Sequence, residues 1–115
     1  MMRASFHDIA GFLGACLVDS ESGLTLMAKA GGPVDLEAAA TFSTQIAAAK
    51  LRVMSAMGLN EKIENVLITQ ADRIHFIRPL EKAPGVILYV CLERKAARLG
   101  MALMQVERIE RDLFM

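Results

Sequence analysis

Few residues of this chain are of the types that carry out catalysis. The 115 residues include two histidines, His7 and His75, and two cysteines, Cys16 and Cys91. Neither histidine has a cysteine or carboxylate at the spacing of a zinc site, so we expect solvated or packing roles for both. Each cysteine lies in an apolar, strand-like run far from the other, which is typical of a buried free thiol and not of a disulfide. Because no acid, base and nucleophile form a set, the sequence predicts a protein that is not an enzyme and needs no metal or other cofactor.

Three other segments resemble binding motifs. The acids and serines of residues 19–22 fall in a predicted hairpin turn, where such side chains bond to their own backbone. Gly31 and Gly32 precede a helix, as in phosphate-binding loops, but no Gly-Lys-Ser/Thr follows and Pro33 lacks an amide donor. The proline after Arg78 indicates a strand end or a sheet edge, and Arg78 itself is a candidate anchor for an acidic group of a partner.

Composition narrows the class of protein further. The chain is 54% hydrophobic with a mean hydropathy of +0.37, which excludes disorder, yet it has no apolar run of the ~20 residues that span a bilayer. Thirteen basic and thirteen acidic residues cancel without forming long blocks, which argues against nucleic acid as a partner. The first residues do not form a secretory signal. We therefore expect a single domain over residues 1–115, located in the cytoplasm and not inserted in a membrane.

The elements that position these residues follow from hydrophobic periodicity. The pattern predicts, in order, a short helical segment, a hairpin, a long helix, three strands and a closing amphipathic helix. Asp35 is the expected N-cap of the long helix and Gly58 its terminator. This order predicts an α/β (α+β) sandwich with a five-stranded antiparallel sheet between helices. The predicted ranges are 2–10, 12–19, 24–28, 34–57, 64–70, 74–80, 86–92 and 94–114.

The long helix has an apolar arc that is wider than one sheet face requires. One stripe is assigned to the sheet: Ala39, Phe42, Ile46, Ala49, Val53 and Met57. A neighbouring stripe has small residues that would let a second helix approach across a two-fold axis, and it is assigned to a dimer contact: Leu36, Ala40, Ser43, Ala47, Leu51 and Met54. The alternative is that the alanines only reflect helix propensity. A polar edge remains for water or a partner: Glu37, Thr41, Thr44, Gln45, Ala48, Arg52 and Ser55.

Several segments together resemble the roadblock/dynein light chain family. They are residues 14–23, the Gly31-Gly32 pair, residues 50–60, residues 63–69 and residues 75–80, and the specificity lies in their order. The resemblance implies a profilin-like sandwich that dimerises through its second helix and third strand. The implied contacts are the dimer stripe above and the edge strand around Glu64, Val66 and Ile68. The segment before residue 12 is shorter than the first helix of many relatives.

The family resemblance also implies a function. Members act as regulators or scaffolds of small Ras-like GTPases, including bacterial polarity and motility GTPases, or as dynein adaptors, and none is an enzyme by itself. The expectation is therefore a homodimer that presents its polar edge to a small GTPase. Since no exposed loop offers an isolated arginine, apart from the weak candidates Arg52 and Arg73, any activation would come from ordering the GTPase switch loops. The alternative is a small-ligand sensor built on the same sandwich plan.

Overall fold

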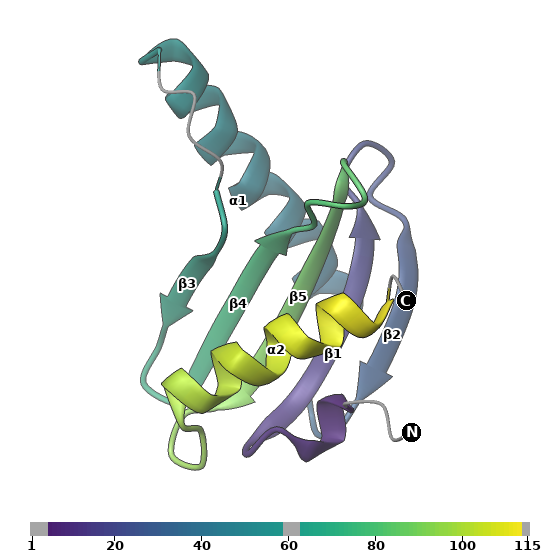
Figure 1. Ribbon diagram of the computed structural model, residues 1–115, viewed down its shortest axis with the longest axis vertical. Helices are drawn as coiled ribbons and strands as arrows, with labels where there is room; N and C mark the ends of the chain where they lie inside the picture. The colour runs from purple at the N-terminus through teal and green to yellow at the C-terminus, as the bar shows by residue number, and fades with distance from the viewer. Residues whose placement is uncertain (1–4, 59–62, 114–115) are drawn as a thin grey trace.

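A five-stranded antiparallel sheet lies between one helix on one face and a helix with a short 3-10 turn on the other (Figure 1). The computed structural model describes residues 5–58 and 63–113 of the chain. The strand order is β2-β1-β5-β4-β3, so β2 and β3 are the edges. The element order confirms the predicted sandwich. The elements are η1 (Phe6–Asp8), β1 (Phe12–Asp19), β2 (Thr25–Ala30), α1 (Leu36–Ala56), β3 (Val66–Thr69), β4 (Arg73–Pro79), β5 (Val86–Glu93) and α2 (Leu99–Leu113).

Several boundaries differ from those predicted. The N-terminal segment makes a single 3-10 turn, and β3 is shorter than residues 64–70. The last helix begins at Leu99 and not at residue 94, because the Arg94 amide donates to the Asp72 carbonyl and ties this stretch to the β3–β4 turn. The parts of the predicted elements at residues 2–4, 59–62 and 114 lie outside the described residues.

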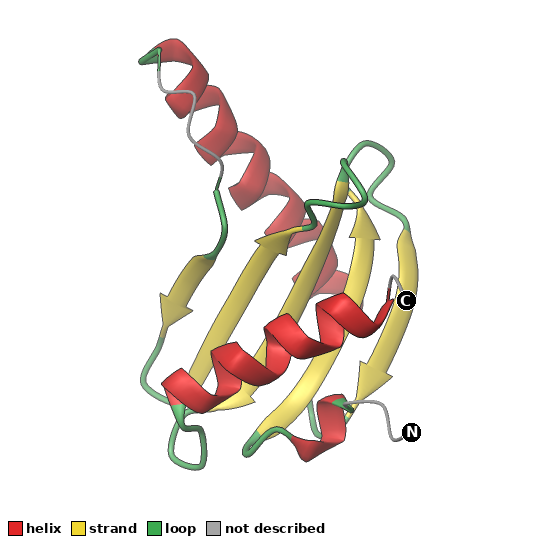
Figure 2. Ribbon diagram, in the orientation of Figure 1, coloured by secondary structure: helices red, strands yellow, loops and turns green. Residues whose placement is uncertain are grey.

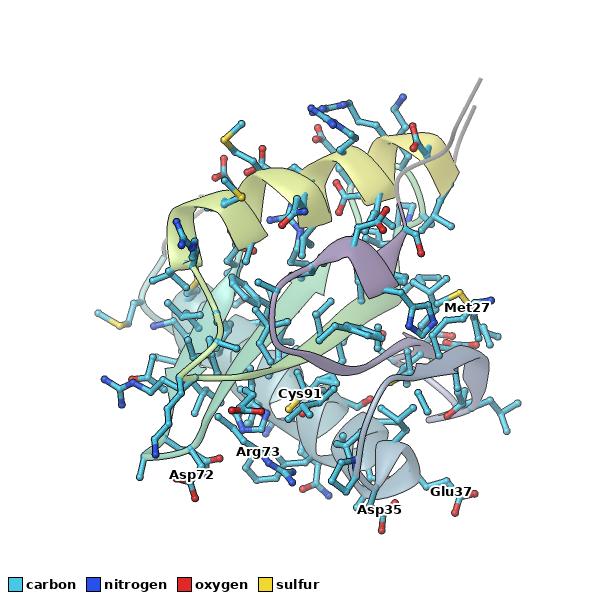
Figure 3. All side chains as sticks on the ribbon, turned by 90° about the horizontal axis from the view of Figure 1, so that it is seen from below. Met27, Asp35, Glu37, Asp72, Arg73 and Cys91 are labelled. Atoms are coloured by element: carbon cyan, nitrogen blue, oxygen red, sulfur yellow. The ribbon has the colours of Figure 1, made fainter. Side chains whose placement is uncertain are left out.

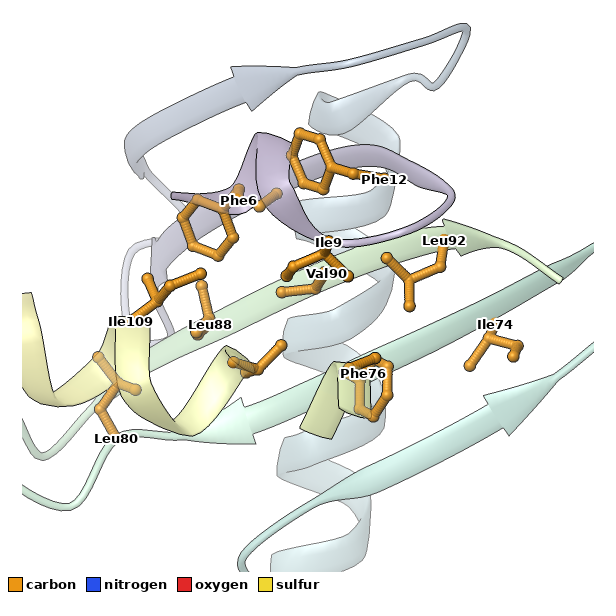
Figure 4. Close-up of a cluster of buried hydrophobic side chains, with 13 residues drawn as sticks. Phe6, Ile9, Phe12, Ile74, Phe76, Leu80, Leu88, Val90, Leu92 and Ile109 are labelled. Atoms are coloured by element: carbon orange, nitrogen blue, oxygen red, sulfur yellow. The ribbon is translucent and has the colours of Figure 1, made fainter. Parts of the chain in front are cut away.

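The main core fills the space between the sheet and α2 (Figure 4). Phe76 of β4, Leu88 and Val90 of β5 and Ile109 of α2 are all buried there, together with Phe6 of η1. β5 is buried on both faces because it lies in the middle of the sheet, paired with β1 and β4. Its uninterrupted apolar sequence predicted this central place, and the prediction is confirmed.

The long helix α1 is defined by the residues at its two ends. The Asp35 carboxylate accepts a hydrogen bond from the Ala38 amide at 3.1 Å, as an N-cap does. At the other end Gly58 has a φ of +72°, the left-handed conformation that favours glycine. Near its start the helix approaches β1 closely, since a Cβ at Gly14 would lie 3.0 Å from the Leu36 Cδ2 atom and 2.6 Å from Cγ1 of Val34, just before the helix. The C-terminal half of α1 projects past the end of the sheet (Figure 2).

Candidate interaction surfaces

The face of α1 that contacts the sheet is made of small side chains. Ala40, Ser43 and Ala47 are only 1%, 1% and 2% exposed in the single chain. Ala40 packs in the cluster that contains Cys16 and Tyr89, and Ala47 packs with hydrophobic residues of β4 and β5. The prediction that Ala40, Ser43 and Ala47 form a dimer contact is therefore wrong, because the fold of one chain already covers them. Small side chains let the helix backbone lie close to the sheet, and the Ser43 hydroxyl donates to the Ala39 carbonyl at 2.6 Å.

Other members of the predicted dimer set have mixed positions. Leu36 is half-buried and packs against the same cluster as Ala40. Met54 is also half-buried, whereas Leu51 is 51% exposed. The set therefore does not form one continuous outer surface.

The stripe assigned to the sheet is instead largely exposed. Phe42, Val53 and Met57 are 58%, 51% and 68% exposed, and Ala49 is exposed as well. We call Phe42, Ala49, Val53 and Met57 the exposed stripe. Only Ala39 and Ile46, at its margin, are half-buried against core clusters. The assignment of this stripe to the sheet is wrong, since its large side chains would hold the helix too far from the strands.

The exposed stripe runs beside the edge strand β3. Ile46, next to the stripe on the helix, and Val66 and Ile68 of β3 all pack against the same buried cluster, which is formed by Ala47, Ile77 and Ile87. Both β3 residues are half-buried, while Leu67 points to the opposite face of the sheet and is 43% exposed. Glu64 is exposed but lies before the strand begins, so it is not part of the edge strand as predicted. An apolar helix stripe and an unpaired strand edge are thus neighbours.

The predicted polar edge of α1 forms one outer side of the helix. Glu37, Thr41, Gln45, Arg52 and Ser55 are exposed, and Glu37 points away from the sheet in Figure 3. The other two members, Thr44 and Ala48, are half-buried. The hydroxyls of Thr41 and Thr44 donate to carbonyls one turn earlier in the helix, at 3.2 and 2.9 Å. The carboxylate of Glu37, the amide of Gln45, the guanidinium of Arg52 and the hydroxyl of Ser55 are therefore exposed polar groups that this edge offers to a partner.

His75 has two hydrogen bonds that fix its neutral form. Its Nε2 atom lies 2.7 Å from the amide oxygen of Gln70, and its Nδ1 atom lies 2.6 Å from the Tyr89 hydroxyl. Because the amide oxygen only accepts, Nε2 carries the proton and Tyr89 donates to Nδ1. Burial, and then the positive charge of Arg73, lower the pKa of His75, while burial raises the pKa of Tyr89. His75 thus has a packing role, one of the two roles expected from the sequence.

The two thiols are inert parts of the core. Cys16 and Cys91 are both fully buried and free. Figure 3 shows Cys91 in the layer between the sheet and α1. Burial raises the pKa of Cys16 to about 11 and also raises that of Cys91. Both are therefore protonated near neutral pH, and neither is an activated nucleophile.

The guanidinium of Arg78 bonds to other residues of the chain. The residue is 7% exposed, and its NH1 group donates to the Asn65 side-chain oxygen at 2.6 Å. Its Nε atom lies 3.4 Å from a carboxylate oxygen of Glu110 on α2. The hypothesis that Arg78 anchors an acidic group of a partner is wrong, because its donors face these internal acceptors beneath α2.

The described part of the chain offers neither a metal site nor a membrane span. Among residues 5–58 and 63–113, no three His, Cys, Asp or Glu side chains gather where they could hold a metal ion. Within those same ranges, no helix combines the length and the apolar character needed to cross a bilayer.

The fold is shared with solved structures. No protein-family model and no curated protein matches the chain. The gliding protein MglB of Thermus thermophilus is similar with a TM-score of 0.76 at 18% identity, over 91% of this chain and 77% of that one. An MglB with a tetrameric arrangement gives 0.78 at 20% identity, over 94% and 79%. A Roadblock/LC7 domain from Streptomyces avermitilis gives 0.72 at 15% identity, over 96% and 92%. These similarities confirm the resemblance seen in the sequence: the chain has the roadblock fold, of the type found in MglB.

Proposed function

We propose that this chain is a non-catalytic, homodimeric platform that regulates or scaffolds a small Ras-like GTPase. The observation that carries the proposal is the exposed stripe of α1 lying beside the unpaired edge of β3. The roadblock fold supports it, because the family that the sequence resembles regulates or scaffolds such GTPases.

A single chain leaves apolar side chains of α1 and the outer edge of β3 uncovered, and both features support a dimer contact there. Phe42, Val53 and Met57 each expose more than half of their apolar side chains along one side of α1, and exposed apolar surface of this kind often marks an interaction site. Beside them, the outer edge of β3 has backbone groups that pair with no strand formed by residues 5–58 and 63–113. A second copy placed across a two-fold axis would cover both features at once, by helix packing and by continuation of the sheet.

Introducing a charged side chain into the exposed stripe tests whether this stripe forms the dimer contact. Val53→Glu should weaken dimerisation at least about tenfold, because the carboxylate would be buried without a partner. Arg52→Glu is the matched control. Arg52 directly precedes Val53 but lies on the polar edge, so this variant should leave the dimer intact. Sedimentation equilibrium at micromolar concentration measures both. A wild-type chain that is monomeric under these conditions overturns the dimer.

The GTPase-binding surface is proposed to be the polar edge of α1. Its exposed carboxylate, amide and guanidinium groups on Glu37, Gln45 and Arg52 point outward from the body of the chain. In a dimer these groups occur twice around the two-fold axis, so they could form a site larger than one helix provides. Polar and charged groups of this kind favour a reversible and selective contact.

Affinity capture and binding measurements test this surface. We expect the chain to retain a small GTPase from lysate of its own organism in the presence of a non-hydrolysable GTP analogue, and much less in GDP. Gln45→Arg should weaken binding of that GTPase at least about tenfold while the dimer persists. If no small GTPase is retained in either nucleotide state, this part of the proposal fails.

The mode of action can be tested separately. Arg73 is held by a 2.9 Å hydrogen bond from its guanidinium to the Pro33 carbonyl, which leaves it poorly placed to insert into another active site. With the GTPase saturated by the chain, so that weaker binding does not lower the rate, we expect Arg52→Ala and Arg73→Ala to leave stimulated GTP hydrolysis within about twofold of wild type, whereas loss of an inserted arginine costs about 10³-fold or more. A loss of that size in either variant would replace ordering of the switch loops by an arginine-finger mechanism.

A further inference from the structure

β2 forms the second edge of the sheet, on the side opposite β3 (Figure 1). Among the strands formed by residues 5–58 and 63–113 its only neighbour is β1, so its outer backbone edge is unpaired within them. Most of this largely apolar strand is exposed, including Leu26 at 57%. β2 shares no residue with the exposed stripe, with the polar edge or with β3. It is therefore a separate surface.

The backbone direction of each β2 residue follows from its contacts with β1. The Gly31 amide, just after the strand, donates to the Leu13 carbonyl at 2.9 Å. The Lys29 carbonyl oxygen lies 3.5 Å from the position that a Cβ at Gly14 would occupy. Both residues thus direct their backbone toward β1. Because backbone groups alternate along an antiparallel strand, those of the two alanines that flank Lys29 point away from the sheet.

The strand has few of the features that block pairing at a sheet edge. It contains no proline, and its pairing with β1 is regular from Met27 to Ala30, with the register shift only before this stretch. The side chains of Ala28 and Ala30 are too small to obstruct an approaching strand. Such an edge is able to bind an extended segment through backbone hydrogen bonds.

The two faces of β2 present different side chains. In the pairing with β1, Lys29 lies opposite Ala15. Met27 lies opposite Leu17. Ala15 is buried in the core beneath α2, and Leu17 and Met27 pack against that core. Lys29 and Met27 are therefore on the α2 side of the sheet, and Ala28 between them is on the α1 side.

Lys29 determines the charge that an added strand should carry. It is the one charged residue of β2, and no carboxylate in the described part of the chain pairs with it. A strand beside β2 would place one residue opposite Lys29, where an opposite charge is favourable. A second copy of β2 has no acid to place there, since its sequence is Thr-Leu-Met-Ala-Lys-Ala. The charge thus favours a different protein as the occupant.

We propose that the outer edge of β2 binds an extended segment of a partner protein as a sixth strand of the sheet. The segment carries Asp or Glu opposite Lys29 and, two residues away on the same face, an apolar side chain beside Met27. Backbone hydrogen bonds to Ala28 and Ala30 supply affinity, and the two side-chain pairs supply specificity. This site goes beyond the proposed GTPase platform and does not rest on it.

Selection from a phage-displayed library of random 12-residue peptides on the full chain supplies the probe. Peptides that also bind Lys29→Glu are removed by counter-selection, and this exposed substitution should fold. We expect the remaining peptides to have Asp or Glu two residues from an apolar residue. Their Kd, measured by fluorescence anisotropy, should rise about fivefold or more in Lys29→Glu. Lys95→Glu, the same charge change between β5 and α2, should bind like the wild type.

N-methylation of the selected peptide distinguishes an added strand from a contact made by side chains alone. Methyl groups on alternate amides should raise the Kd at least about tenfold, while those on the amides between should change it little, because only every second amide faces β2. Replacing the acid of the peptide by Lys should weaken binding to the wild type and restore binding to Lys29→Glu.

Four results would overturn the proposal. They are a selection that yields no peptide dependent on Lys29, N-methyl groups without the alternating effect, an exchange of charges that does not restore binding, and a smaller oligomer in Ala28→Pro than in the wild type. Ala28→Pro removes one outward amide of the edge, so that last result, in sedimentation equilibrium, would assign the edge to a second copy.

Discussion

His75 and Tyr89 form a polar contact within a largely apolar layer on the α1 side of the sheet. Their rings are stacked with centroids 5.7 Å apart, and the Tyr89 hydroxyl donates to the imidazole. The contact needs a neutral imidazole, because a protonated Nδ1 could not accept that hydrogen bond. At the scale of single residues, the stability of the fold is thereby linked to the protonation state of one histidine.

This link predicts a dependence of stability on pH. The pKa of His75 is lowered in the folded chain, so the unfolded chain binds the proton more readily. The contribution of His75 to the free energy of unfolding is complete above about pH 6.5 and is lost progressively as the pH falls toward the folded-state pKa. Urea denaturation between about pH 5.5 and 7.5 should show this loss, and His75→Gln should reduce the slope. An identical slope in His75→Gln would contradict the assignment.

Arg78 shows why some single residues were misjudged from sequence. A proline follows it and it ends a strand, which indicates an edge where an arginine could reach a partner. The structure instead buries it under α2, with Asn65 and Glu110 as its acceptors. Neither acceptor is close to it in sequence, so no local pattern reveals the pairing.

At the scale of elements, hydrophobic periodicity predicted most of the fold. β1 has the predicted limits, and the Asp35 and Gly58 signals placed both ends of α1, because caps and turns depend on local chemistry. The orientation of α1 was not predictable in the same way. Its two apolar stripes are adjacent, and both have enough apolar surface to cover a sheet. The stripe of small residues faces the sheet because its members allow a closer approach, which depends on the packing of two layers.

A matched pair of alanines tests which face of α1 is buried. Ala47→Leu should destabilise the chain by about 1–3 kcal/mol, because the site is fully packed. Ala49→Leu, two residues later, should change the free energy of unfolding by less than about 0.5 kcal/mol, because Ala49 is exposed. Thermal or urea denaturation compares the two variants; equal destabilisation would mean that the faces are assigned wrongly. Measurements in Val53→Glu remove any contribution from dimerisation.

At the scale of the whole molecule, the sequence is 54% hydrophobic but does not show which of its apolar residues remain exposed after folding. The structure places part of the exposed apolar surface on α1, in the exposed stripe and in Leu51, and the rest on β2, β3, α2 and the turn before β2. The sequence also did not predict the hollow lined by Leu51, the segment before β3, the end of β4 with its following loop, and α2, because only the tertiary fold brings these four segments together.

If two copies associate through the exposed stripe, folding and assembly are coupled. The melting temperature of the wild-type chain should then rise as the protein concentration is raised from about 1 to 100 µM, since association stabilises only the folded state. Phe42→Glu should remove this concentration dependence, whereas Gln45→Glu, on the polar edge, should keep it. Differential scanning fluorimetry at several concentrations is sufficient. A wild-type melting temperature that does not change with concentration would indicate that folding and association are independent.

The projection of α1 beyond the sheet also sets a gradient of local stability along one helix. Backbone amides near Ala40 and Ala47 belong to turns packed on the core, whereas those of the last two turns, near Val53, have little tertiary contact to protect them. Hydrogen exchange in the isolated chain should therefore be slow in the first half of α1 and fast in the second. A ligand that slows exchange in the second half uses part of its binding free energy to order those turns, so its measured affinity understates the strength of its contacts.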